Sequence, residues 1–91
     1  MTDIQVEVFT APGCGKCGRA REVLKDIADA WTEADIRWRE VNILDELDYA
    51  VELGVLATPA IAIDGRLVFT ALPSEKKLRQ ALQDRLEEKQ A

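Results

Sequence analysis

Apolar and polar residues alternate along the chain in patterns that predict seven short elements in the order β-α-β-α-β-β-α. The first strand is predicted at 4–9, where apolar and polar side chains alternate and β-branched residues are common. A helix follows over about 15–31, and its apolar stripe recurs at spacings of three and four: Cys17, Ala20, Val23, Leu24, Ile27 and Trp31. A second strand is expected at 36–43 and a second helix at 45–53.

The second helix is short, and its pattern predicts three inward side chains, those of Leu47, Ala50 and Val51. Gly54 follows it as a natural C-cap. Two further strands are predicted at 60–63 and 66–69, separated only by the dipeptide Asp64-Gly65. That dipeptide is a strong hairpin signal, because both residues tolerate the positive φ angles of a tight turn.

The last predicted helix begins after Pro73, with Ser74 as its N-cap and with Leu78, Ala81, Leu82, Arg85 and Leu86 in helical phase. Two β-α-β connections imply parallel strands with right-handed crossovers, and the hairpin adds an antiparallel edge. We therefore expect an α/β fold in which one mixed four-stranded sheet is flanked by three helices. The length is suited to a single domain over 1–91.

Composition narrows the class of protein without changing this picture. A hydrophobic fraction of 47% supports a packed core. The net charge of −5 and the absence of a basic block argue against a nucleic-acid partner. No apolar run approaches the roughly 20 residues that cross a bilayer, and the first residues lack the pattern of an export signal. We expect a cytoplasmic protein with no membrane partner.

The two cysteines, Cys14 and Cys17, are the residues that carry most chemical information. They are separated only by Gly15 and Lys16, and they lie where the first strand gives way to the first helix. In a reducing cytosol such a pair is more often catalytic or metal-binding than structural. The chain has no histidine, which excludes a Cys–His pair, a Ser–His–Asp triad and a histidine-liganded zinc site within it.

The position of the pair on the helix predicts different roles for its two members. A helix N-terminus has unpaired backbone N–H groups and partial positive charge, both of which favour a thiolate. Cys14 is expected at this open end, where it attacks a substrate disulfide. Cys17 falls on the apolar stripe, one turn into the helix, from where it attacks Cys14 and releases the reduced substrate.

A second candidate element is Thr58-Pro59, directly before the third strand. By position alone the sequence slightly favours a proline that simply opens a strand, since proline cannot donate a ladder hydrogen bond. Taken with the cysteine motif, it resembles the thioredoxin-like superfamily, in particular its short, glutaredoxin-sized bacterial and archaeal members. The residues that carry the resemblance are Cys14-Gly15-Lys16-Cys17, Val41-Asn42-Ile43, Leu53-Gly54-Val55, Thr58-Pro59 and Asp64-Gly65.

The resemblance implies a nucleophile at Cys14, a resolving cysteine at Cys17 and a cis proline at Pro59 facing the disulfide. It also implies that the backbone of Thr58 pairs with an extended substrate segment. We add Gly13, which precedes Cys14, and Gly15 and Lys16, which lie between the two cysteines, as substrate contacts.

The chain departs from the superfamily at several of these positions. Gly13 precedes the first cysteine where tryptophan is usual, and Lys16 stands where proline is usual. Val8 occupies the place of a buried aspartate and Glu40 that of its neighbouring lysine, so Glu40 is either a substitute base or an exposed carboxylate. The glutathione-binding segment of glutaredoxins has no counterpart at 70–74.

The leading hypothesis is a dithiol–disulfide oxidoreductase, an electron carrier that reduces protein disulfides through Cys14 and Cys17. It needs no cofactor or metal of its own, and a flavoprotein of the thioredoxin reductase type would recycle it. The alternative is a metal-binding module in which two chains share zinc or an iron–sulfur cluster through the same cysteines. A third is a non-catalytic docking platform, which would not require an intact cysteine pair.

Overall fold

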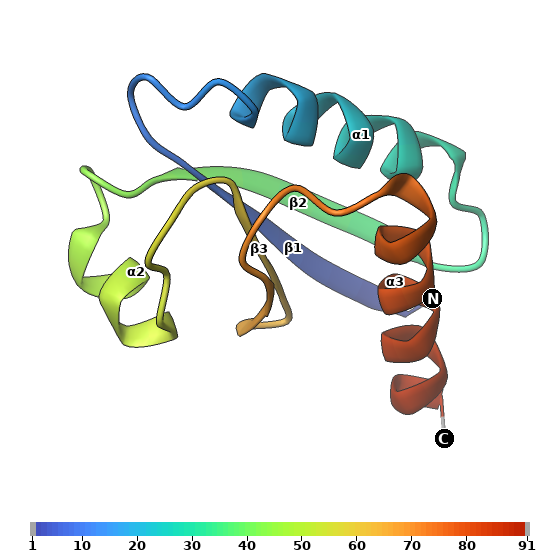
Figure 1. Ribbon diagram of the computed structural model, residues 1–91. Coiled ribbons are helices and arrows are strands. Elements are labelled where there is room, and N and C mark those ends of the chain that lie inside the picture. Colours follow the sequence, from blue (N-terminus) through green and yellow to red (C-terminus); the bar gives the residue numbers. More distant parts are fainter. Residues whose placement is uncertain (1, 91) are drawn as a thin grey trace.

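Four strands and three helices follow one another in the predicted order (Figure 1). The computed structural model of the protein describes residues 2–90. The strands are β1 (Asp3–Thr10), β2 (Asp35–Asn42), β3 (Ala60–Ile63) and β4 (Arg66–Phe69), and the helices are α1 (Cys17–Ala30), α2 (Leu47–Leu53) and α3 (Glu75–Gln90). The expected α/β fold, with one mixed four-stranded sheet and three helices, is confirmed.

The strands form one sheet in the order β2-β1-β3-β4. β1 and β2 are parallel, and Val8 lies opposite Glu40. β1 and β3 are antiparallel, and Phe9 lies opposite Ala60. β3 and β4 form the predicted antiparallel hairpin. Its two-residue turn uses positive φ angles at Asp64 (49°) and Gly65 (80°), as the dipeptide predicts.

The expectation of a second parallel connection is wrong, because β3 runs antiparallel to β1. The reason lies in helix length. The eight residues of β2 extend over about 26 Å, and the 14 residues of α1 return the chain along about 21 Å of that length. The seven residues of α2 span only about 10 Å. The chain therefore enters β3 near the end at which it left β2, and it runs back in the opposite direction.

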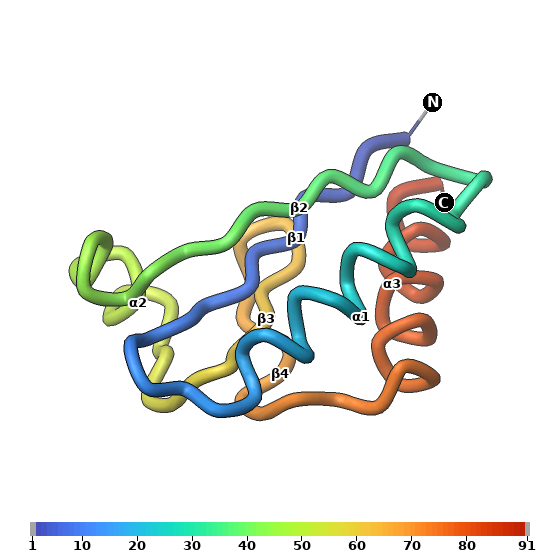
Figure 2. The backbone as a smooth tube through the Cα atoms, turned by 90° about the horizontal axis from the view of Figure 1, so that it is seen from above, coloured from blue at the N-terminus to red at the C-terminus, as the bar shows by residue number. Residues whose placement is uncertain are grey.

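The helices cover both faces of the sheet (Figure 2). On one face, Ile4, Val6 and Val8 of β1 pack with the apolar stripes of α1 and α3. On the other face, Phe9, Val41 and Ala62 pack with Ala50 of α2. Because successive side chains of β1 point to opposite faces of the sheet, they pack into two separate cores.

The boundaries of two helices and the inner face of one differ from the predictions. α1 begins at Cys17 instead of about Gly15, and it ends before Trp31, which is its C-cap. α2 begins at Leu47, two residues after its predicted start. Leu47 and Val51, predicted to be inward, are 55% and 67% exposed. A helix of two turns buries only a narrow stripe, here centred on Ala50.

Two predicted caps are confirmed. Gly54 ends α2 with φ 90°, and its N–H donates to the carbonyl groups of Ala50 and Val51. At the start of α3, the hydroxyl oxygen of Ser74 accepts a hydrogen bond of 3.2 Å from the N–H of Lys77. Both caps satisfy backbone groups that a helix end leaves without partners.

Candidate active site

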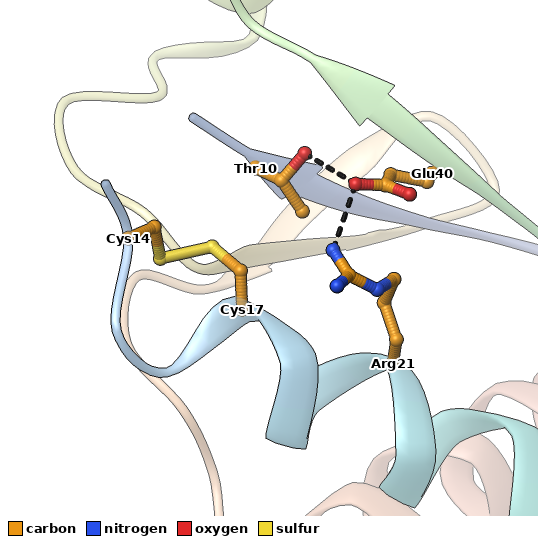
Figure 3. Close-up of a disulfide and its surroundings, with 5 residues drawn as sticks. All are labelled: Thr10, Cys14, Cys17, Arg21 and Glu40. Carbon is orange, nitrogen blue, oxygen red and sulfur yellow. Dashed lines mark hydrogen bonds and ion pairs between the residues drawn. A yellow bond between two sulfur atoms is a disulfide. The ribbon is translucent and has the colours of Figure 1, made fainter. Parts of the chain in front are cut away.

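Cys14 and Cys17 form a disulfide at the junction between β1 and α1 (Figure 3). The S–S distance is 2.09 Å and the two Cα atoms are 5.6 Å apart. Gly13 has a φ of 79°, and the N–H of Cys14 donates to the carbonyl group of Ala11 over 3.2 Å. A tight turn therefore places Cys14 just before the start of α1. The disulfide between the two sulfur atoms leaves the helix intact.

The two cysteines have different surroundings. Cys17 is the first residue of α1 and is only 3% exposed, whereas Cys14 lies in the preceding turn and is partly exposed. The first α-helical hydrogen bond joins the N–H of Ala20 to the carbonyl of Lys16. Cys17 is thus inward, as predicted, but at the first helical position and not one turn into the helix.

The start of α1 is open to a negative charge. The side chain of Lys16, at the N-cap position, makes no capping hydrogen bond, and the first turn contains no acidic residue. The early N–H groups of the helix are therefore not neutralised by a side chain of that turn, and they favour a thiolate nearby. Gly13, Gly15 and Lys16 are all exposed in the turn that contains Cys14.

The second predicted element reaches the same end of the sheet. The Thr58–Pro59 peptide bond is cis, as the resemblance implied. Because Phe9 pairs with Ala60, Pro59 comes next to Thr10, from which the chain leads to Cys14. Pro59 is buried and Thr58 is partly exposed. The sheet register therefore brings the two predicted site segments together at the C-terminal end of β1.

Glu40 is exposed, which is one of the two predicted alternatives, but its carboxylate is not free of contacts. One of its oxygens accepts a hydrogen bond of 2.8 Å from the hydroxyl of Thr10 and lies 2.9 Å from Nη1 of Arg21. Figure 3 shows the three side chains beside the disulfide, above the first turns of α1. Sequence reasoning missed Thr10 and Arg21. Two features of the sequence could have indicated these contacts to Glu40: a threonine on the same face of β1 as Val8, and an arginine four residues after Cys17.

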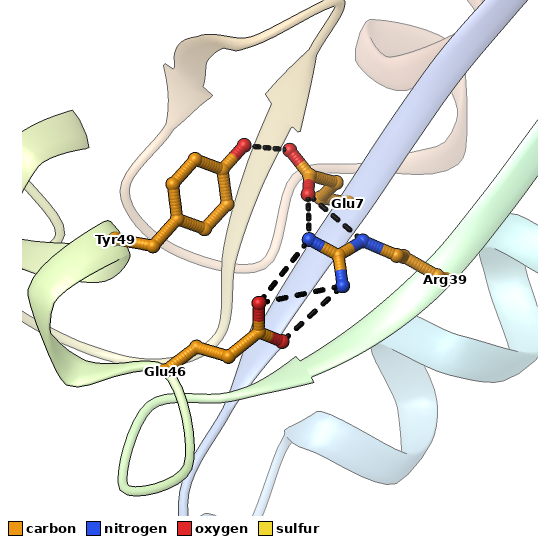
Figure 4. Close-up of polar contacts among 4 residues, drawn as sticks. All are labelled: Glu7, Arg39, Glu46 and Tyr49. Atoms are coloured by element: carbon orange, nitrogen blue, oxygen red, sulfur yellow. Dashed lines mark hydrogen bonds and ion pairs between the residues drawn. The ribbon is translucent and has the colours of Figure 1, made fainter.

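A second polar cluster lies on the sheet face that α2 covers (Figure 4). The carboxylate of Glu7, only 11% exposed, lies 2.6 Å from Nη2 of Arg39 and accepts a hydrogen bond from the hydroxyl of Tyr49. Arg39 also lies 3.2 Å from Glu46. Burial, with the adjoining Glu7 carboxylate, raises the pKa of Tyr49 to about 12. These contacts join α2 to β1 and β2.

The metal-binding alternative finds no support in the geometry. Among residues 2–90, no group of three or more histidine, cysteine, aspartate or glutamate side chains is placed to hold a metal ion. The two cysteines are bonded to each other. None of the helices in the same range is both long and apolar enough to cross a membrane.

Comparisons with known proteins agree with one another. The family described as Thioredoxin domain matches residues 3–83. The thioredoxin of Methanocaldococcus jannaschii is 30% identical over 86 residues, which cover 94% of this chain and 100% of the relative. A probable thioredoxin of Methanothermobacter thermautotrophicus is 34% identical over 84 residues, covering 92% and 98%.

Solved structures show the same fold at lower identity. A mutant thioredoxin from Halobacterium salinarum superposes with a TM-score of 0.77 and 22% identity, covering 91% of this chain and 74% of that one. Mitochondrial thioredoxin 3 from Saccharomyces cerevisiae gives a TM-score of 0.71 and 24% identity, covering 92% and 80%.

Proposed function

This chain belongs to the thioredoxin domain family and is a thiol–disulfide oxidoreductase; from that premise we propose that Cys14 is its nucleophile and Cys17 its resolving cysteine. The observation that carries the assignment is the asymmetry of the pair. Cys17 is buried at the first position of α1, while Cys14 is partly exposed in the turn before it. A bulky disulfide substrate can therefore approach Cys14 more readily than Cys17.

The reaction proceeds through two exchanges. The thiolate of Cys14 attacks one sulfur of the substrate disulfide, forms a mixed disulfide and displaces the other sulfur as a thiolate, which takes up a proton. Cys17 then loses its proton and attacks the sulfur of Cys14. The bond between Cys14 and the substrate breaks, and the second substrate sulfur leaves with its electron pair. The substrate gains two electrons and two protons, and the Cys14–Cys17 disulfide remains.

Substrate contacts are assigned to Gly13, Gly15, Lys16, Thr58 and Pro59. The first three are exposed beside Cys14, and the last two reach the same end of the sheet through the pairing of β3 with β1. The partly exposed Thr58 lies just outside β3, so its backbone is suited to pair with an extended substrate segment.

The setting and the electron donor complete the proposal. The chain acts as a single domain over 1–91 in the cytoplasm, where reducing conditions favour catalytic over structural cysteine pairs. Its electrons come from a flavoprotein of the thioredoxin reductase type. The segment 70–74 lacks the pattern that binds glutathione in glutaredoxins, which supports this choice of donor.

An insulin-reduction assay tests the proposal. With dithiothreitol as the donor, the protein should accelerate precipitation of the reduced insulin chains, and the Cys14→Ser variant should not. The donor is tested by turnover with NADPH and thioredoxin reductase, compared with NADPH, glutathione and glutathione reductase. Faster turnover with glutathione would refute the donor assignment, and no acceleration with any donor would refute the function.

A further inference from the structure

The charges of the chain are distributed unevenly. The segment 40–65 contains six acidic residues and no lysine or arginine: Glu40, Asp45, Glu46, Asp48, Glu52 and Asp64. The rest of the chain has 12 basic residues against the remaining acidic ones, an excess of one positive charge. By contrast, the charged residues between Val8 and Glu22, around the two cysteines, are all basic.

The acidic segment also exposes large apolar side chains. Leu44, Leu47 and Val51 are 65%, 55% and 67% exposed. The four-residue spacing of Leu47 and Val51 places them on one side of α2, and Leu44 is exposed in the turn that precedes the helix. We call these three residues the α2 stripe. Each of the three is followed directly by an exposed carboxylate, Asp45, Asp48 or Glu52, and these form an acidic rim.

The α2 stripe lies at the same end of the molecule as the disulfide. In both Figure 1 and Figure 2, α2 and the turn between β1 and α1 are at the end away from α3. Leu56, which is 98% exposed, belongs to the loop that leads from α2 to Thr58 and Pro59. A protein that rests on α2 is therefore held at the end of the molecule where Cys14 lies.

We propose that the α2 stripe and its acidic rim are a docking surface that selects substrate proteins with apolar side chains flanked by lysine or arginine near their disulfide. Docking would remove the apolar surface of the α2 stripe from water, which favours binding of apolar side chains. The negative charge of the rim favours substrates that carry positive charge beside those side chains. This proposal rests on the proposed function, because it names the class of protein disulfides that the oxidoreductase would reduce.

The charge of the rim disfavours other occupants. A second copy docked stripe to stripe would oppose six carboxylates with no basic residue from either segment. An anionic membrane surface would be repelled in the same way. A basic and apolar protein surface satisfies both parts of the patch.

Matched disulfide peptides test this docking surface. Three peptides share one disulfide and carry an extension of leucine with lysine, leucine with glutamate, or serine with lysine. For the leucine–lysine peptide we expect kcat/KM to be about five to ten times higher than for either other peptide at low ionic strength. The ratio of kcat/KM between the leucine–lysine and leucine–glutamate peptides should fall as added salt screens the charges. Equal kcat/KM for the three peptides would overturn the proposal.

Single variants locate the effect on the molecule. Asp48→Lys and Leu47→Ser should each raise KM for the leucine–lysine peptide severalfold. Reduction of a small disulfide, such as dithiobis(nitrobenzoate), should be unchanged. Glu33→Lys and Val68→Ser make analogous changes, acidic to basic and apolar to polar, at exposed positions outside the patch and serve as controls. Equal losses in the controls would overturn the docking surface, whereas failure to reduce the small disulfide would instead refute the proposed function.

Discussion

Asp64 shows how a single residue can serve two purposes. The Asp64-Gly65 dipeptide predicts a turn, and the turn is present with both residues at positive φ. The carboxylate of Asp64 also accepts hydrogen bonds from the N–H of Gln5 at 2.9 Å and from Arg85 at 2.7 Å. Lys89 lies 3.2 Å away. Burial alone would raise the pKa of this carboxyl, but the hydrogen bonds outweigh burial and lower the pKa.

Replacing Asp64 with asparagine isolates the charge, because asparagine also tolerates the left-handed conformation. We expect Asp64→Asn to reduce the free energy of unfolding by about 1–2 kcal/mol at neutral pH. The folded-state pKa lies below the unfolded value of about 3.9, so the stabilisation is complete above that value and is lost as the pH falls through the folded pKa. Urea unfolding at pH 7 and at pH 3 measures this. An equal deficit at both pH values would contradict the account.

At the scale of the elements, α2 is held by polar contacts that its sequence pattern does not reveal. Its apolar pattern correctly placed Ala50 inward, but Leu47 and Val51, also predicted to be inward, are exposed. Tyr49 instead donates a hydrogen bond to the buried Glu7, which is also paired with Arg39. Glu7 is 42 residues from Tyr49 in sequence, so the contact follows from packing across the sheet and not from any local spacing.

The chain contains one tyrosine, so its absorbance titration reports on Tyr49 alone. In the folded protein the phenol should ionise near pH 12, because burial and the Glu7 carboxylate disfavour the phenolate. In urea it should ionise near pH 10. Since the folded pKa is raised, the stabilisation is complete below about pH 10 and is lost as the pH approaches the folded value. Titration near pH 10 in the folded protein would show that this contact does not form.

The C-cap of α2 gives a second test at this scale. Gly54 has φ 90°, and an added Cβ would meet only Leu67 at 4.0 Å. Gly54→Ala should therefore cost about 1–2 kcal/mol from backbone strain alone. Gly18→Ala, inside α1, is the matched control and should stabilise the protein by about 0.5–1 kcal/mol, because alanine favours a helix. Thermal unfolding distinguishes the two, and equal shifts in Tm would contradict the cap assignment.

For the whole molecule, periodicity and turn chemistry were enough to predict the number, order and type of elements. Strand direction was harder to predict. To predict the direction of β3, the length of α2 must be compared with the length of the sheet. A pattern of apolar positions does not supply that comparison. The cysteine pair was evident because two residues of one type lie at a recognisable spacing. The Glu40–Thr10–Arg21 cluster was not, because it depends on the register of β1 against β2 and on the position of α1.

The central claim is that Cys14 attacks and Cys17 resolves. It is tested most directly by trapping the mixed disulfide. Reduced Cys17→Ser and Cys14→Ser variants are each mixed with an oxidised protein substrate, and the covalent adducts are quantified by mass spectrometry under denaturing, non-reducing conditions. The account predicts a stable adduct through Cys14 in the Cys17→Ser variant and little adduct in the Cys14→Ser variant, whose remaining cysteine is buried. An adduct that forms mainly through Cys17 would contradict it.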